Sequence, residues 1–307
     1  MARDLRALGR ALGGAGAALL LSACATDLTQ ARSPCVYEPG GWCGFTRDLA
    51  EESWQYAQLS NDVYRDEEKF PHPTGDYVMA PDTPAKHEAG YAYIVYDRYA
   101  PDAGGGEKRL AERVIAYRGT EMNSFQDWVL GNIGAQYNDR GWDTYAEQRK
   151  MLDEQGLDAV PITLTGHSLG GAIAAYVALR EPRARSYAFN QSPRFSVPEE
   201  PTRNRRVAVS ERGEALRGLP AGGGVFLQDM LVLNCRPNGA PWKDHSVRKL
   251  SECLTWIAAY GDPQALASVR ENAIPKPAIE CGPPGKAHPG DAPPEGVCRH
   301  NREIEEE

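Results

Sequence analysis

Residues 161–181 restrict the fold of this chain more than any other stretch, because a strand, a tight turn and a helix follow one another there. The strand reads PITLT, the turn GHSLG and the helix LGGAIAAYVALRE, which ends before Pro182. A residue at the tip of so sharp a turn has a strained backbone, so Ser168 needs small neighbours, and Gly166 and Gly170 supply them. The order predicts an α/β fold with Ser168 at the end of a central strand.

The turn has the pattern G-x-S-x-G, the nucleophile elbow of serine hydrolases. Three fixed Gly and Ser positions arise by chance about 0.1 times in a chain of this length. The motif alone is therefore weak, and its place between a strand and a helix is what makes Ser168 a candidate nucleophile. A serine is a poor nucleophile at neutral pH, so the chain must also supply a histidine base and a carboxylate.

Length and charge narrow the class of protein. The chain has 307 residues, 41% of them hydrophobic and 25% charged, which suits one large α/β domain or two small ones. The net charge is −8, and we find no block of Lys and Arg. We therefore expect no nucleic-acid partner.

The N-terminus predicts export. Basic residues precede a short apolar run, ALGGAGAALLL (11–21), which is too short to span a bilayer as a stable helix. Residues 1–23 are therefore predicted to be a signal peptide. LSAC (21–24) resembles a bacterial lipobox, which implies that Cys24 is diacylated and anchors the chain to a membrane. Ala25, in place of Asp, favours an outer-membrane lipoprotein that faces the periplasm or the cell surface.

The cysteines agree with an oxidising compartment. Seven are present, and assigning Cys24 to lipid leaves an even set of six, which predicts disulfides. Nearness in sequence favours three pairs: Cys35 with Cys43, Cys235 with Cys253, and Cys281 with Cys298. Because the chain has no C-x-x-C motif, we expect neither a zinc site nor thiol redox chemistry.

The pattern along the chain predicts four parts: the signal peptide 1–23, a tether with a disulfide loop at 24–47, an α/β domain at 48–274, and a Pro-rich, disulfide-stapled tail at 275–307. Within the domain we expect helices at 48–64, 142–155, 169–181 and 245–260, the last capped by Asp244. Strands are expected at 91–99, 113–117, 161–165, 186–190, 206–210 and 226–234.

The base is sought downstream of the serine, because α/β-hydrolases have the chain order Ser, Asp/Glu, His. His72, His87 and His167 precede Ser168 in the chain. His288 and His300 lie in the tail, where a solvated surface histidine is the simpler interpretation. His245, which opens the last predicted helix, is the candidate base.

The acid must lie between Ser168 and the base, just after a strand. RVAVSERGEALRGLP (206–220) offers Glu211 and Glu214. Asp229 lies within an apolar run, and Asp244 is more simply a helix cap. The spacing alone leaves both glutamates open.

Several motifs together resemble the class 3, or fungal-type, lipase family over roughly residues 48–260. They are YRGT (117–120), Asp127-Trp128, TGHSLGGA (165–172), YAFNQSPRF (187–195), an acid loop ending in Leu-Pro, and a late histidine. The resemblance implies an α/β-hydrolase fold, a central mostly parallel sheet flanked by helices. Its acid loop places Glu214 before Leu219-Pro220. That family usually has Asp here, so Glu211 remains an alternative.

The resemblance also implies the rest of the site. The backbone N–H groups of Leu169 and Thr120 are the expected oxyanion hole, and residues 121–136 are either a lid or core. The implied activity is hydrolysis of lipid esters, as a triacylglycerol lipase or a phospholipase A, through an acyl-enzyme and without a metal or cofactor. Two alternatives are a thioesterase or peptidase on the same fold, and a catalytically inactive envelope-binding lipoprotein.

Overall fold

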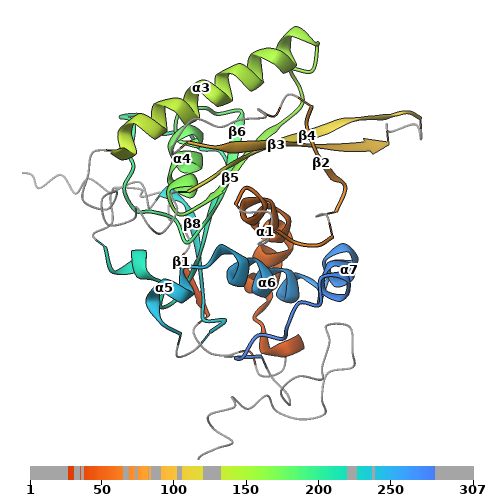
Figure 1. Cartoon of the computed structure of the whole chain (residues 1–307), viewed down its shortest axis with the longest axis vertical. Helices are drawn as coiled ribbons and strands as arrows, with labels where there is room; N and C mark the ends of the chain where they lie inside the picture. Colours follow the sequence, from red (N-terminus) through yellow and green to blue (C-terminus); the bar gives the residue numbers. More distant parts are fainter. Residues whose placement is uncertain are drawn as a thin grey trace, which may run out of the picture.

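An eight-stranded sheet runs through the centre of the computed structural model (Figure 1). The structure describes residues 27–30, 35, 38–64, 69–72, 75–81, 83, 91–101, 106–119, 133–219, 227–236 and 239–280. Its strands are β1 (Asp27–Gln30), β2 (Tyr77–Met79), β3 (Tyr93–Pro101), β4 (Lys108–Tyr117), β5 (Ile162–His167), β6 (Ala184–Phe189), β7 (Arg206–Glu211) and β8 (Asp229–Leu233).

The strand order is β1-β8-β7-β6-β5-β4-β3-β2. β4 to β8 are parallel, β1 pairs parallel with β8, and β2 and β3 form an antiparallel edge. Every residue of β5 is buried, as expected for a parallel strand that is covered on both faces. The predicted fold class, a mostly parallel sheet flanked by helices, is confirmed.

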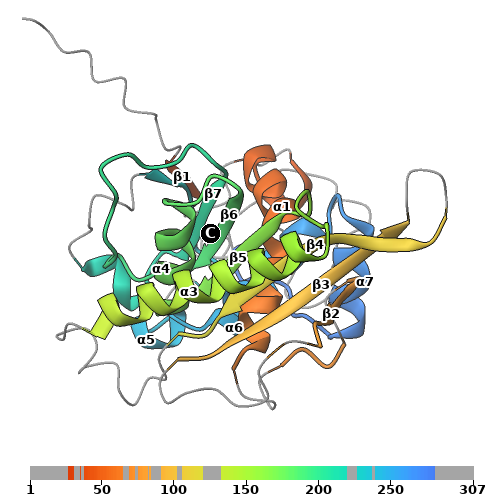
Figure 2. The same ribbon diagram turned by 90° about the horizontal axis from the view of Figure 1, so that it is seen from above.

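Helices cover both faces of the sheet (Figure 2). They are α1 (Gly44–Asp62), α3 (Ile133–Glu154), α4 (Leu169–Ala178), α5 (Pro241–Asp244), α6 (Val247–Ala258) and α7 (Pro263–Glu271), with short 3-10 turns η1 (Pro39–Gly41) and η4 (Ala215–Gly218). One hydrophobic cluster joins α1, α6 and α7 to one face, with Trp54 and Trp256 fully buried. A second cluster joins α3 and α4 to the other face, around Leu152 and Ile173.

A buried carboxylate fixes α1 to the sheet. Glu112 on β4 accepts hydrogen bonds from Tyr56 of α1 (2.8 Å), Tyr77 of β2 (2.7 Å), Thr163 of β5 (2.6 Å) and Arg185 of β6 (2.6 Å). Burial opposes ionisation of this carboxylate, but these donors and the Arg185 charge hold its pKa below the usual value. α1 is thereby held in a defined position across four strands.

Three predicted helix starts are wrong. The helix expected at 48–64 begins four residues earlier, at Gly44, with Cys43 as its cap. The helix expected at 245–260 begins at Val247, with Ser246 as its cap, because Asp244 is already inside the short helix α5 that Pro241 opens. The helix expected at 142–155 begins nine residues earlier, at Ile133. Among the described residues, no helix is long and apolar enough to cross a membrane.

Two of the three predicted disulfides are confirmed, Cys35–Cys43 and Cys235–Cys253. Cys281 and Cys298, like Cys24, lie outside the described residues.

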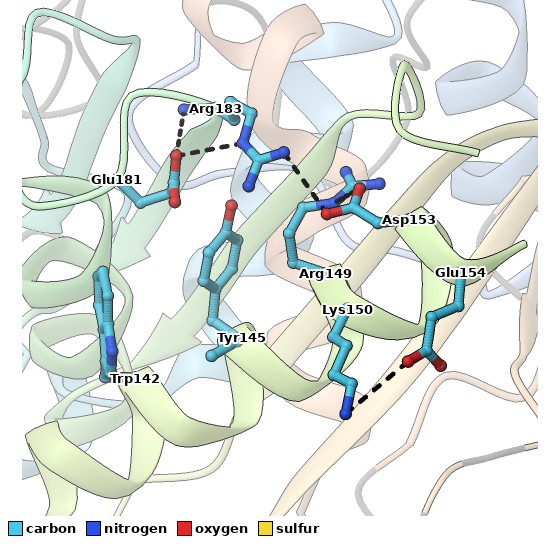
Figure 3. Close-up of a pocket in the computed structure, with 9 residues that line it drawn as sticks. Trp142, Tyr145, Arg149, Lys150, Asp153, Glu154, Glu181 and Arg183 are labelled. Atoms are coloured by element: carbon cyan, nitrogen blue, oxygen red, sulfur yellow. Dashed lines mark hydrogen bonds and ion pairs between the residues drawn. The ribbon is translucent and has the colours of Figure 1, made fainter. Parts of the chain in front are cut away.

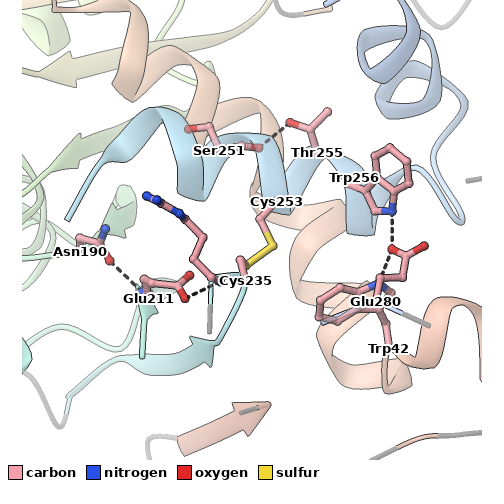
Figure 4. The surroundings of a disulfide bond; sticks show 10 residues. Trp42, Asn190, Glu211, Cys235, Ser251, Cys253, Thr255, Trp256 and Glu280 are labelled. Atoms are coloured by element: carbon pink, nitrogen blue, oxygen red, sulfur yellow. Dashed lines mark hydrogen bonds between the residues drawn. A yellow bond between two sulfur atoms is a disulfide. The ribbon is translucent and has the colours of Figure 1, made fainter. Parts of the chain in front are cut away.

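The described start of the C-terminal tail packs on the core, since the buried Glu280 accepts hydrogen bonds from the indoles of Trp42 and Trp256 (Figure 4). Of the segment expected to be a tether, residues 27–30 form β1 and Trp42 is buried.

Candidate active site

Ser168 lies between β5 and α4 with φ 57° and ψ −119°. Positive φ is unusual for a residue with a side chain, and main-chain hydrogen bonds hold it. The Ser168 N–H donates to the Phe189 carbonyl (3.0 Å), and the Ser168 carbonyl accepts from Ser192 N–H (3.0 Å) and Ala172 N–H (3.2 Å). The strained turn predicted from G-x-S-x-G is therefore present.

The two glycines of the motif leave no room for a side chain. A Cβ on Gly166 would lie 2.4 Å from the carbonyl carbon of Gly170, and one on Gly170 would lie 2.1 Å from the Tyr117 carbonyl oxygen. The elbow is thus pressed against the end of β4. Gly119, just after β4, is also close, since a Cβ there would lie 3.2 Å from Ser168 Cβ.

The structure brings together Glu214 and His245. Glu214 Oε2 lies 2.8 Å from His245 Nδ1, and both side chains are buried. The same oxygen accepts the Leu216 N–H (2.8 Å), because Glu214 is the cap of η4. His245 is the C-terminal cap of α5. A buried, hydrogen-bonded carboxylate of this kind fixes both the tautomer and the orientation of an imidazole.

Glu211 points elsewhere. It ends β7, and its Oε1 accepts the Arg236 N–H (3.1 Å) beside the Cys235–Cys253 disulfide (Figure 4). Burial raises the pKa of Glu211 to about 7. Of the two glutamates left open by the sequence, Glu214 is the one that contacts His245.

Two side chains form hydrogen bonds to the main-chain carbonyls of Asp244 and His245. His167 Nε2 lies 2.7 Å from the His245 carbonyl oxygen, and Asn190 Nδ2 donates to the Asp244 carbonyl (3.2 Å). Asn190 has φ 40°, and its Oδ1 accepts the Glu211 N–H (2.8 Å). The sequence offered no sign of these roles, because His167 is the variable position of the motif and Asn190 is a strand end.

The expected oxyanion donors are described in part. Leu169 is the first residue of α4, where backbone N–H groups have no partner within the helix. Thr120 and residues 121–132 of the expected lid lie outside the described residues, and residues 133–136 belong to α3.

A separate pocket of about 480 Å³ lies along α3 (Figure 3). It contains none of Ser168, Glu214 and His245. Its charged groups pair with one another, as in Arg149–Asp153 and Lys150–Glu154. The described residues include no group of three or more His, Cys, Asp or Glu side chains that could hold a metal ion.

Comparisons with known proteins place this site in context. Residues 55–193 match a family model described as phospholipase-like, the Tle-like phospholipase domain. No curated protein sequence matches the chain.

Solved structures that match this chain include lipase II from Rhizopus niveus (15% identity, 56% of this chain and 75% of that chain, TM-score 0.39). A mutant form of MDLA from Penicillium cyclopium gives 16% identity, 66% and 86% coverage, and a TM-score of 0.43. The Rhizomucor miehei triacylglyceride lipase gives 16% identity, coverage of 58% of this chain and 76% of that chain, and a TM-score of 0.36. Together with the sheet topology, the family-model match confirms the predicted lipase-like α/β-hydrolase, an ester hydrolase.

Proposed function

We propose that this chain hydrolyses lipid esters with Ser168 as nucleophile, His245 as general base and Glu214 as the carboxylate that orients the imidazole. The observation that carries the proposal is the 2.8 Å contact of Glu214 Oε2 with His245 Nδ1. The ring of His167, the residue before the strained Ser168, has its centroid 4.6 Å from that of the His245 ring. Because Nδ1–H is bound to Glu214, the basic nitrogen of the neutral imidazole is Nε2.

The reaction has two steps. Ser168 Oγ attacks the acyl carbonyl while its proton passes to His245 Nε2, and the leaving alcohol takes that proton as the ester bond breaks. Water then attacks the acyl-enzyme with His245 again as base, releasing a fatty acid and restoring the serine. The Leu169 N–H, and that of Thr120 as the family resemblance implies, stabilise the negative charge on the carbonyl oxygen.

A phospholipid is the substrate class that we favour. The matching family model is described as a phospholipase domain, and it includes Ser168 within residues 55–193. A membrane-bound enzyme of this kind would meet diacyl phospholipids as its most abundant ester.

The activity is tested with a fluorophosphonate probe and with lipid substrates. The wild type is expected to be labelled at Ser168, and Ser168→Ala to be unlabelled and inactive on p-nitrophenyl esters. On vesicles of phosphatidylethanolamine and phosphatidylglycerol, mass spectrometry is expected to find lysophospholipid and free fatty acid. Labelling without release of fatty acid from vesicles or triacylglycerol emulsions would instead indicate a thioesterase or peptidase. An unlabelled wild type would indicate an inactive binding protein.

The proposed location is the outer membrane of a bacterial cell envelope, with the chain anchored by a diacylated Cys24. This rests on the lipobox resemblance of residues 21–24 and on the export signal. Mass spectrometry of the mature N-terminal peptide tests it directly. A diacylglyceryl modification is expected on Cys24 and is absent in Cys24→Ser, whereas cleavage at another residue would rule the anchor out.

A further inference from the structure

A line of hydrogen bonds runs from Gly119 through Tyr64 and His167 to the main chain of His245, and it is separate from the bonds of the proposed triad. The Gly119 N–H, just after β4, donates to Tyr64 Oη (3.1 Å). Tyr64 Oη lies 2.9 Å from His167 Nδ1, and His167 Nε2 lies 2.7 Å from the His245 carbonyl oxygen. The rings of His167 and His245 are also close, with centroids 4.6 Å apart. The line therefore joins the end of β4 to the main chain of the base.

Each bond in this line has one possible direction. The His245 carbonyl can only accept, so His167 carries its proton on Nε2. A neutral imidazole then accepts at Nδ1, where the Tyr64 O–H donates, and Tyr64 Oη accepts in turn from the Gly119 N–H. Burial, with the neighbouring His245, lowers the pKa of His167 well below its usual value, so the ring stays neutral.

We propose that Tyr64 and His167 are positioning residues, which fix the His245 main chain relative to the end of β4 through this line of hydrogen bonds. The inference rests on the proposed function of Ser168 and His245. Glu214 binds Nδ1 and so sets the rotation of the imidazole, but it does not fix the position of the His245 main chain. The His167 donor holds that main chain from the opposite end of the residue.

The line ends at Gly119, beside the residue that is expected to supply an oxyanion donor. Gly119 precedes Thr120, the expected oxyanion residue, and it is packed against the elbow. The same hydrogen bonds thus fix Gly119, which precedes the expected oxyanion donor, relative to the main chain of His245. A shift of about 1 Å in such relative positions costs on the order of 100-fold in rate, because reaction requires near-attack geometry.

Tyr64→Phe is the smallest test, since it removes one oxygen and leaves the Gly119 N–H and His167 Nδ1 without their present partner. We expect kcat on a soluble p-nitrophenyl ester to fall about 10- to 100-fold with KM within about twofold of wild type. Rates are normalised to active sites by end-point titration with a fluorophosphonate, which removes the effect of misfolded protein. The matched control is Tyr176→Phe, which loses a surface hydroxyl bound to Asp139 and is expected to keep the wild-type kcat.

A double-mutant cycle tests whether Tyr64 acts through His167. In a His167→Ala background, Tyr64→Phe is expected to have no further effect on kcat. His167→Gln keeps an amide donor near the former Nε2 and is expected to retain more activity than His167→Ala. A Tyr64→Phe enzyme within twofold of wild type in kcat, or additive effects in the cycle, would overturn the proposal.

Failure here is distinct from failure of the proposed function. A wild-type enzyme that the probe does not label would remove the function itself. A wild type that is labelled and hydrolyses the ester, beside an unimpaired Tyr64→Phe, would remove only the positioning role.

Discussion

Glu211 is a buried carboxylate whose charge disfavours the folded state. Burial raises its pKa from 4.5 to about 7, and the neighbouring Asp244 acts in the same direction, while Arg236 and two backbone N–H groups oppose them. Since the folded-state pKa lies above the unfolded one, this group favours folding below pH 4.5. That contribution is lost as pH rises through 7. A pKa difference of this size corresponds to about 3 kcal/mol.

Glu211→Gln removes this charge and keeps an oxygen acceptor for the Arg236 N–H. We expect the variant to be more stable than wild type, by a margin that grows by about 2.5 kcal/mol between pH 5 and pH 8. Urea denaturation followed by tryptophan fluorescence at several pH values measures the margin. Because the comparison is between variant and wild type at each pH, the titration of groups that do not interact with Glu211 cancels.

The same variant separates the two glutamates as triad acids. Glu214 contacts His245 and Glu211 does not, so Glu211→Gln is expected to keep kcat at pH 8 within a few-fold of wild type. A margin that is flat with pH would show that the Glu211 carboxyl titrates normally in the fold. A loss of kcat of about 10⁴-fold would identify Glu211 as the orienting carboxylate and remove Glu214 from that role.

Three further variants probe the site. Glu214→Gln retains a carbonyl for the Leu216 N–H but cannot stabilise an imidazolium, so kcat on a soluble ester is expected to fall about 10⁴-fold with unchanged circular dichroism; a loss below tenfold would contradict this. Gly170→Ala places a methyl group against the Tyr117 carbonyl and is expected to cost about 3 kcal/mol of stability in thermal denaturation, whereas wild-type stability would show that the elbow can yield. Asn190→Asp turns a donor into a second oxygen facing the Asp244 carbonyl and is expected to cost about 1–3 kcal/mol in urea at pH 8; the prediction fails if the midpoint is unchanged.

The parts of this molecule that the sequence predicts are those set by local geometry. Strand, G-x-S-x-G and helix are contiguous, so Ser168 appears on the expected turn between β5 and α4. Cys235 and Cys253 lie 18 residues apart, and nearness in sequence was enough to pair them. Glu214 and His245 follow the ends of successive strands, which parallel topology brings to one edge of the sheet.

The parts that the sequence could not predict depend on tertiary packing. Tyr64 follows α1 and reads locally as one more apolar position of a helix. It lies 103 residues from His167 and 55 from Gly119 in the sequence, and it meets both in the folded protein, where α1 is packed on the sheet. The start of α6 was predicted wrongly for a different reason. Asp244 and Ser246 are both good helix caps, but Asp244 belongs to the short helix α5, so Ser246 caps α6.

The direction of β1 shows at which edge of the sheet its first residue lies. β1 runs parallel to β8, with Asp27 opposite Met230 and Gln30 opposite Leu233, so the chain enters the sheet at its amino edge. The nucleophile and base follow carboxyl ends, and even a four-residue strand separates the two edges by about 13 Å. If Cys24 is acylated as we propose, the lipid would be attached three residues before β1, nearer in sequence to the edge of the sheet that lies opposite the nucleophile and the base.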